Sequence, residues 1–428
     1  MQKQVSMVLI GAGNRGRGAY GNYALNNPHR AKFVAVVEPD QVRRDAFAAA
    51  HGIPESLRFE KTDDLFSRQG KIADAMVIAT LEDVRVDVTL KSIAAGYHIL
   101  IEKPLGLSAE DIVKITDAAS RYDGVFVVCH QMRHMRPYAV IKSLITSGRF
   151  GDIVTVHHSE NISYIHMAHS FVRGICRNLT PLILSKCCHD MDMLRYLVDR
   201  RPVRISSFGG LNHFTEENAP EGATDYCLDG CPAYRECPYH VQKVYFHPDV
   251  DQAHLRQMGV VKDKKQLFEL LQNGQYGKCV FKSDNTVVDH QVVNIEFAGG
   301  VTAAMQFSGH NILEQRITKI SMTNGDISFF YTLSRSADSV EGVVVARSFE
   351  PLTEETINPG DMSGGHMGGD QVIMDSFVDA IRTGKKEDYL LTPVETSLDS
   401  HLMSFAAEKA RVDGVVIDMK EFEASCRT

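Results

Sequence analysis

The sequence predicts an α/β domain built on a doubly wound parallel sheet, followed by an α+β domain with an open, mostly antiparallel sheet. Three observations carry this prediction. Apolar runs alternate with helical patterns through residues 5–130, a glycine-rich turn follows the first run, and longer alternating strand patterns fill the later part. The chain has 428 residues, more than one hydrophobic core usually supports. We therefore expect one domain at 1–130 and a second at 131–428.

Five short apolar runs in the first domain are typical of buried parallel strands: residues 5–10, 32–38, 73–80, 97–102 and 125–130. The segments between them have helical patterns. Two of these segments end on Gly52 and Gly96, which suit a left-handed helix cap. Ser108 and Asp111 form a capping box at the start of a third helix, over 108–122.

The turn after the first strand reads GAGNRG, so Gly11, Gly13 and Gly16 have the G-x-G-x-x-G spacing. This spacing lets the backbone turn tightly and bring helix amides to a pyrophosphate. Glu38 ends the second strand, where a carboxylate accepts hydrogen bonds from ribose hydroxyls and repels a 2′-phosphate. NAD is therefore favoured, although the nearby Arg43 and Arg44 leave NADP open. The other expected cofactor contacts are Asn14, Arg15, Thr80, Glu102 and Lys103.

The fourth strand is followed by IEKPLG, which contains Glu102, Lys103 and Pro104. Together with the glycine-rich turn, residues 133–156 and the histidine segment at 189, it resembles the Gfo/Idh/MocA family of NAD(P)-dependent carbohydrate oxidoreductases. The resemblance covers most of the chain. It implies a sugar substrate and a homodimer or homotetramer formed through the outer face of the second sheet.

Oxidising a secondary alcohol requires a base for the hydroxyl proton beside the carbon that loses hydride. Lys103 lies at the carboxyl edge of the sheet and is the expected base, as the resemblance also implies. The family usually shows an aspartate, a histidine four residues later and a second aspartate three further on. His189 and Asp192 match the last two, and we expect His189 to act in catalysis or substrate binding. Ser185 replaces the first aspartate and Lys186 follows it, which predicts a more cationic site with both side chains at the substrate.

A second set of polar side chains lies just before this segment. His166, His169, Arg173 and Arg177 are spaced three, four and four apart, so a helix would place them on one face. They form either a solvated polar face or a substrate wall that binds sugar hydroxyls and an anionic group. Tyr164 and His166 are also candidates for a second acid/base pair.

The second domain shows hairpin patterns around Gly299-Gly300 and around Asn324-Gly325, the latter with a type I′ turn signal. An amphipathic helix is expected over 391–414. Before it, a glycine-rich loop leads into a helix that we expect Asp370 to cap. This loop either brings His366 to the pocket or is a connector.

Residues 215–286 have the character of an insertion. Its Cys227, Cys231 and Cys237, with His240, could bind a structural zinc ion, although the spacing is not a standard zinc pattern. Reduced thiols in a compact loop are the alternative, and an iron–sulfur centre is less favoured. The adjacent pair Cys187 and Cys188 points about 100° apart on a helix, so both are expected to pack in the interior.

The amino-acid composition favours a small-molecule partner. The formal net charge is -8 without a lysine–arginine block, which argues against nucleic acid and membrane binding. No apolar run approaches the length of a membrane span, so we expect a cytoplasmic protein. The leading hypothesis is NAD-dependent oxidation of a ring hydroxyl of a pyranose or glycoside, with C3 favoured. A redox-neutral glycosidase using transient C3 oxidation is the first alternative, and a non-catalytic dinucleotide-binding sensor is the second.

Overall fold

A computed structural model describes residues 4–174, 178, 180–248, 250, 252–258, 261, 263–333, 340–389 and 391–427. The chain forms two compact units. The first comprises Met1–Ala139, Asp361–Leu402 and Glu423–Thr428, and the second comprises Val140–Gly360 and Met403–Phe422. Residues 361–402 therefore return to the first unit, although the sequence prediction placed them in the second domain.

The first unit contains a six-stranded parallel sheet with strand order β3-β2-β1-β4-β5-β6. This is the doubly wound order, and the five predicted strands are confirmed. The sixth strand, β3, is only two residues long, too short for a sequence pattern. The strands are β1 (Val5–Ile10), β2 (Ala31–Val37), β3 (Arg58–Phe59), β4 (Ala75–Ile78), β5 (His98–Ile101) and β6 (Phe126–Val128).

Helices connect these strands, and the predicted caps are mostly present. Gly52 and Gly96 adopt left-handed conformations with φ of 64° and 75°. Ser108 accepts a hydrogen bond from the Asp111 amide at 3.1 Å. Asp370 does not cap its helix, because Gly368 occupies the N-cap position. The helices are α1 (Asn22–Asn26), α2 (Gln41–His51), α3 (Thr62–Phe66), α4 (Arg85–Ala94), α5 (Ala109–Ser120) and α13 (Gly369–Thr383).

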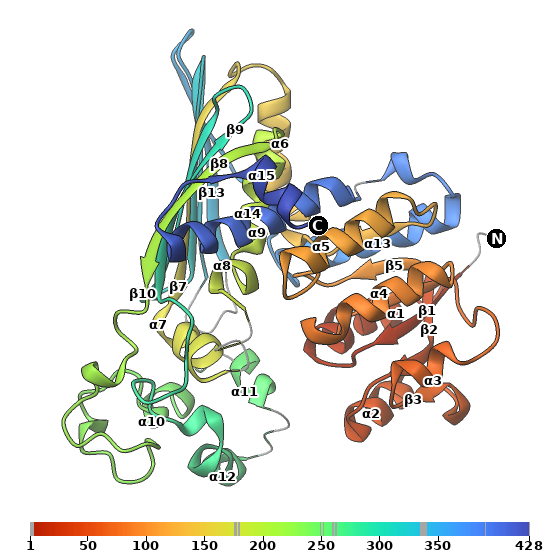
Figure 1. Cartoon of the computed structure of the whole chain (residues 1–428), viewed down its shortest axis with the longest axis vertical. Coiled ribbons are helices and arrows are strands. Elements are labelled where there is room, and N and C mark those ends of the chain that lie inside the picture. Colours follow the sequence, from red (N-terminus) through yellow and green to blue (C-terminus); the bar gives the residue numbers. More distant parts are fainter. Residues whose placement is uncertain are drawn as a thin grey trace. The chain divides into compact units, whose positions relative to one another are not determined.

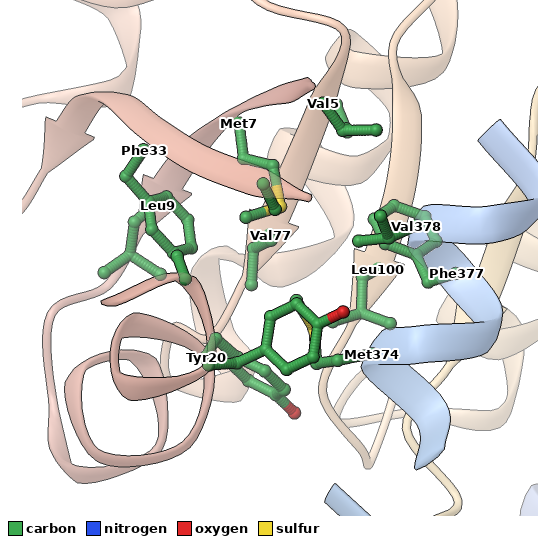
Figure 2. Close-up of a cluster of buried hydrophobic side chains, with 14 of the residues drawn as sticks. Val5, Met7, Leu9, Tyr20, Phe33, Val77, Leu100, Met374, Phe377 and Val378 are labelled. Atoms are coloured by element: carbon green, nitrogen blue, oxygen red, sulfur yellow. The ribbon is translucent and has the colours of Figure 1, made fainter. Parts of the chain in front are cut away.

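Helix α13 belongs to the first unit because its apolar face completes that unit's core. Figure 2 shows Met374, Phe377 and Val378 of α13 turned toward Val77 and Leu100 of the sheet. Side chains of this size contribute about 1.5–3 kcal/mol each when fully buried. The sheet would lose this cover if the first domain ended near residue 130.

The second unit contains a nine-stranded sheet with strand order β14-β13-β12-β11-β7-β10-β9-β8-β15. Its neighbouring strands are antiparallel except for β7 and β10, which confirms the predicted open sheet. The strands are β7 (Ile153–Ser163), β8 (Pro202–Gly210), β9 (His290–Phe297), β10 (Thr302–Asn311), β11 (Gln315–Met322), β12 (Gly325–Leu333), β13 (Val340–Ser348), β14 (Thr353–Ile357) and β15 (Ile417–Asp418).

Both predicted hairpins are present, but the turn type of the second was wrong. Gly299 and Gly300 have positive φ and join β9 to β10. Met322 pairs with Gly325, so Thr323 and Asn324 are the central residues, and neither has positive φ; the turn between β11 and β12 is therefore not type I′. Gly325 is required for another reason, since a Cβ there would lie 2.1 Å from the Arg347 carbonyl oxygen of β13.

The predicted insertion lies between β8 and β9 and carries a small core of its own, in which Val241, Tyr245 and Leu271 are fully buried. Its helices α10 and α12 are marked in Figure 1. No described helix is long and apolar enough to cross a membrane. The remaining helices are α6 (Arg136–Thr146), α7 (Tyr164–His166), α8 (Leu182–Ser185), α9 (Cys188–Val198), α10 (Val241–Tyr245), α11 (Gln252–Met258), α12 (Lys264–Asn273), α14 (Val394–Asp413) and α15 (Met419–Ser425).

Candidate functional site

The three glycines of the first turn are needed for different reasons. Gly11 has φ of 94°, and a Cβ on it would lie 2.6 Å from the Ala79 carbonyl oxygen. A Cβ on Gly16 would lie 2.0 Å from the Gly11 carbonyl oxygen. A Cβ on Gly13 would meet nothing within 4 Å. The first two glycines therefore shape the turn, whereas Gly13 leaves open the side by which a pyrophosphate approaches the backbone.

Glu38 stabilises the same turn from the end of β2. One carboxylate oxygen accepts a hydrogen bond from the Ala12 amide at 2.7 Å, and the other accepts one from the Asp40 amide at 3.1 Å. Each oxygen can accept a further hydrogen bond, as a ribose contact requires. Arg44 donates to the Glu38 carbonyl oxygen at 2.5 Å, so a guanidinium group lies beside this position.

Arg15 is held between two carboxylates instead of being available as a simple phosphate ligand. Its guanidinium lies 2.7 Å from Glu102 and 2.7 Å from Asp370. Burial would raise the pKa of Glu102, but Arg15 and the Tyr20 hydroxyl together lower it. His366 contacts Asp370 at 3.1 Å, which links the glycine-rich loop before α13 to Arg15.

Lys103 follows β5 in a turn that is fixed from several directions. The peptide between Lys103 and Pro104 is cis, and the Lys103 side chain is half-buried. The buried guanidinium of Arg85 donates to the carbonyl oxygens of Thr80 and Pro104. The Leu105 amide donates to His401 at 3.1 Å. These contacts fix the backbone from which the Lys103 side chain extends at the carboxyl edge of the sheet.

A buried set of charged side chains lies on the inner face of the second sheet. We call it the inner ion cluster. Arg316 on β11 lies opposite Glu160 on β7, at 2.5 Å, and 2.6 Å from Asp190 on α9. Lys186 lies 3.1 Å from Glu160 and 3.6 Å from Glu314. The cluster consists of His158, Glu160, Lys186, Asp190, Glu314 and Arg316.

The inner ion cluster corrects the expectation of a more cationic site. Burial would lower the pKa of Lys186, but Glu160 and Glu314 raise it, so the ammonium group is retained and paired. Burial raises the pKa of Glu160 in spite of Arg316 and Lys186. Burial also favours a raised pKa for Asp190, but Arg316 and His158 lower it below the ordinary value. Three carboxylates thus surround the two cations Lys186 and Arg316, so the charge of Lys186 is balanced.

His166 is fixed by a carboxylate of this cluster. Its Nδ1 lies 2.6 Å from Glu314, which also accepts a hydrogen bond from the Ser163 amide at 3.1 Å. Among the described residues the Nε2 of His166 has no hydrogen-bond partner. A carboxylate that holds one ring nitrogen leaves the other suited to accept or donate a proton. Tyr164, two residues earlier, is half-buried and packs edge-on against Tyr239.

His189 lies in the first turn of α9 and is 6% exposed, with Asp192 fully buried one turn further on. Ser185 ends α8, so the segment from Ser185 to His189 joins two helices. Cys187 and Cys188 are fully buried, in agreement with the packing role predicted for them. Burial raises the pKa of the Cys187 thiol, which disfavours a thiolate.

His169 and Arg173 lie in the interior, so the predicted substrate wall is corrected. Both belong to a π-helical segment, Met167–Arg173. His169 contacts Tyr245 and Gln257, and burial lowers its pKa to about 2. Arg173 donates to the carbonyl oxygens of Lys278 and Tyr239 in the insertion. Arg177 lies outside the described residues.

Of the predicted zinc ligands Cys227, Cys231, Cys237 and His240, the histidine is held by the backbone through both ring nitrogens. His240 donates through Nε2 to the Cys227 carbonyl oxygen at 2.9 Å, and its Nδ1 accepts from the Gln242 amide at 3.3 Å. Both ring nitrogens are therefore in use. No three histidine, cysteine or acidic side chains stand in a metal-coordinating arrangement in the described part of the chain.

Sequence reasoning missed Arg85 and most of the inner ion cluster. A signal for the cluster was present, because His158 and Glu160 alternate on β7 with a period of two. Polar side chains at alternate positions of a strand normally face water, so this pattern did not distinguish a buried ionic cluster from a solvent-exposed face of the sheet. Arg85 gave no signal, since a lone arginine in a helix usually lies at the surface.

Comparisons with known proteins agree with the two units. Residues 5–130 match the "Oxidoreductase family, NAD-binding Rossmann fold" model, and residues 142–416 match the "Oxidoreductase family, C-terminal alpha/beta domain" model. The oxidoreductase YteT of Bacillus subtilis (strain 168) is 22% identical over 331 residues, 74% of this chain and 75% of that protein. The 2,7-anhydro-N-acetylneuraminate hydratase of Mediterraneibacter gnavus is 22% identical over 208 residues, 49% of this chain and 53% of that protein.

A solved structure of similar fold is levoglucosan dehydrogenase in complex with NADH and levoglucosan. It has a TM-score of 0.67 at 16% sequence identity and covers 97% of this chain and 100% of that one. At this identity the likeness shows the fold alone. The two family models together span most of the chain, so the chain belongs to the Gfo/Idh/MocA oxidoreductase family, with an NAD-binding Rossmann domain followed by the family's C-terminal α/β domain.

Proposed function

We propose that the protein is an NAD-dependent oxidoreductase that acts on a ring hydroxyl of a pyranose or glycoside, with C3 as the favoured position. The inner ion cluster carries the proposal. It surrounds the start of the helix that bears His189 with carboxylates and cations already paired to one another. Its partly exposed members Lys186 and Glu314, each with an 18% exposed side chain, can offer hydrogen bonds to a neutral polyol without exposing an uncompensated charge.

The first unit is suited to the dinucleotide. Gly13 leaves its outer side free of protein atoms, and Glu38 provides the acidic group expected beside an adenosine ribose. When bound, NAD accepts a hydride from the carbinol carbon and, in a redox-neutral reaction, returns it. Asn14, Thr80 and Glu102 are the further contacts we propose, and Arg44 keeps NADP open.

The protein's own part of the reaction is proton transfer. We assign Lys103 as the base that removes the hydroxyl proton and His189 as the group that orients the same hydroxyl. This assignment rests on the family pattern, and the fixed turn at Pro104 supports it by limiting where Lys103 can reach. Ser185 and Lys186 are proposed substrate neighbours, with Lys186 acting as a partner of Glu160 and Glu314.

The test is Lys103→Met in the full-length protein, assayed with a panel of pyranoses and glycosides. Single-turnover hydride transfer should fall about 10²- to 10⁴-fold, the usual contribution of a positioned acid or base, while NAD affinity stays within about threefold. Lys114→Met, at an exposed lysine of α5, is the matched control. Unchanged turnover would sink the base assignment. Stoichiometric NAD binding without turnover of any sugar by the unmodified protein would favour a sensor.

A redox-neutral glycosidase is the second candidate, and the contact between His166 and Glu314 favours it. Oxidation at C3 acidifies the C2 proton, and a further base must remove that proton before the aglycone leaves and water adds. His166, held by Glu314 at 2.6 Å, is suited to this role, with Tyr164 as the companion acid. The hydratase relative from Mediterraneibacter gnavus shows that a protein of partly similar sequence adds water to a sugar derivative.

Aryl glycosides separate the two candidates. With no NAD added, aglycone release without net NADH indicates the glycosidase, whereas NADH formation that requires added NAD indicates the dehydrogenase. His166→Gln should then stop aglycone release but leave single-turnover oxidation at C3 intact. Loss of both steps together would refute the division of roles.

We further propose self-association through the outer face of the second sheet, as a homodimer or homotetramer. Ile317 and Phe330 lie opposite each other on β11 and β12, and Phe208 and Val292 lie opposite each other on β8 and β9. All four are exposed apolar side chains, Phe208 at 66%. Phe330→Asp should lower the mass measured by sedimentation, whereas Leu352→Asp, in an exposed turn, should not.

A further inference from the structure

The insertion contains a small cavity that four cysteines line together. These are Cys227, Cys231, Cys237 and Cys279, and the cavity has a volume of about 10 Å³. This is close to the space that one water-sized sphere occupies. The cavity therefore suits a single ion and is too small for an iron–sulfur cluster.

Backbone pairing brings the distant Cys279 to the other three. Tyr226 and Lys278 form an isolated antiparallel bridge. The Cys227 amide donates to the Gly277 carbonyl oxygen at 3.0 Å, and the Cys279 amide donates to the Asp225 carbonyl oxygen at 2.8 Å. Cys227 and Cys279 thus each follow one residue of this bridge, which brings two cysteines from distant parts of the chain together.

Arg173 provides a second, independent observation. Its side chain lines the same cavity and is 1% exposed, and its Nη2 lies 3.6 Å from the Cys227 sulfur. Among the described residues it has no carboxylate partner, and its buried Nη1 has no hydrogen-bond partner. A buried guanidinium without a counter-charge is strongly unfavourable, and four neutral thiols do not supply one.

We propose that Cys227, Cys231, Cys237 and Cys279 bind one zinc ion as four thiolates, with Arg173 as the charge partner of the complex. Four thiols lose four protons to solvent and no electron is transferred. Zinc with four thiolates carries a net charge of -2, which the guanidinium partly neutralises. The sulfur atoms are not in a coordinating arrangement as described, so the side chains must turn into the cavity on binding.

His240 holds the ligand backbone in this assignment and does not bind the ion. Its ring donates to the carbonyl oxygen of Cys227, a ligand residue. Arg173 in turn ends the π-helical segment that follows Tyr164 and His166. The zinc site thereby supports the loop that carries two candidate acid/base groups, and it does so whichever reaction the protein performs.

The test measures zinc bound to the full-length protein after expression with added zinc under reducing conditions. One zinc ion per chain is expected. Cys279→Ser and Cys237→Ser should lose it, whereas His240→Asn and the control Cys426→Ser should retain it. Retention by Cys279→Ser together with loss by His240→Asn overturns the ligand set. No zinc in the unmodified protein, or iron with labile sulfide, overturns the site.

Variants that fail to fold do not decide the question, because the unmodified protein gives an independent measurement. Stepwise modification of its thiols should release zinc in proportion to the reaction of four cysteines, and the cobalt-substituted protein should show the charge-transfer bands of a tetrahedral thiolate site. Arg173→Met should lower zinc affinity about 10- to 100-fold, as outer-shell changes typically do. Zinc release that tracks fewer thiols, or affinity unchanged in Arg173→Met, contradicts the proposal.

Discussion

Replacing Lys186 by methionine tests how much the charge pairing in the inner ion cluster stabilises the fold. The Lys186 side chain is 18% exposed, and its Nζ lies 3.1 Å from Glu160 and 3.6 Å from Glu314. Methionine keeps most of the volume and removes the charge. Among the residues that the structure describes, Glu160, which is almost fully buried, then retains Arg316 as its one cationic partner.

The expected loss of unfolding free energy follows from these distances. At an effective dielectric constant of about 20, unit charges 3.1 Å apart attract by about 5 kcal/mol, and the second contact is of similar size. Desolvation of the ammonium group offsets a large part of this attraction. Removing one partner of a buried ion pair typically costs about 3–5 kcal/mol, and we expect a loss of unfolding free energy in that range near neutral pH.

The loss should depend on pH with a definite sign. The folded-state pKa of Glu160 is already raised, so its contribution to stability is complete below its unfolded pKa and is lost as the pH rises through the folded value. Without Lys186 this pKa rises further. The stability difference between the two proteins should therefore be larger at about pH 8 than at about pH 5, which lies closer to the ordinary glutamate pKa.

Urea unfolding followed by circular dichroism at both pH values measures this difference. Lys409→Met is the control, because Lys409 pairs with Asp413 at the surface and such pairs contribute about 0–1 kcal/mol. A loss in Lys186→Met no larger than in the control, or one that does not change with pH, would refute the reasoning. Lys186→Arg should restore most of the stability.

Three further predictions follow from the geometry. Gly13→Ala should leave the unfolding midpoint unchanged but weaken NAD binding, measured by calorimetry, at least about tenfold. Gly16→Ala should instead destabilise the fold, because its Cβ would lie 2.0 Å from a carbonyl oxygen. Equal effects of the two substitutions on stability and NAD binding would contradict this difference. Arg85→Met should lower kcat more than it raises KM, because the turn it fixes carries the proposed base, and unchanged kcat would count against that positioning role. Glu314→Gln should reduce the stability gained above the ordinary glutamate pKa, since Glu314 has a lowered folded pKa; urea unfolding at acidic and neutral pH measures this, and an equal loss at both pH values would contradict it.

Sequence patterns were sufficient for the first sheet and the glycine-rich turn. Parallel strands buried on both faces appear as continuous apolar runs, and the turn that binds a dinucleotide needs glycines at fixed positions. Both features can therefore be recognised from residues that are neighbours in the sequence. The hairpin between β11 and β12 was also recognised, but its turn type was not. Gly325 is there because β13 passes within 2.1 Å of where its Cβ would lie, and β13 is not visible to a local pattern.

Tertiary structure decided which polar residues gather in the interior. His169 and Arg173 have the spacing of a polar helix face, yet both are buried and form hydrogen bonds with residues of the insertion. Glu160, Lys186, Glu314 and Arg316 come from three separate segments and meet only when β7 pairs with β11. The sequence by itself determined the fold class, the cofactor turn and the positions of Lys103 and His189, because each depends on neighbours along the chain. The charge balance around Lys186 and the fourth cysteine of the insertion cavity depend on pairing between distant strands, which only the folded chain fixes.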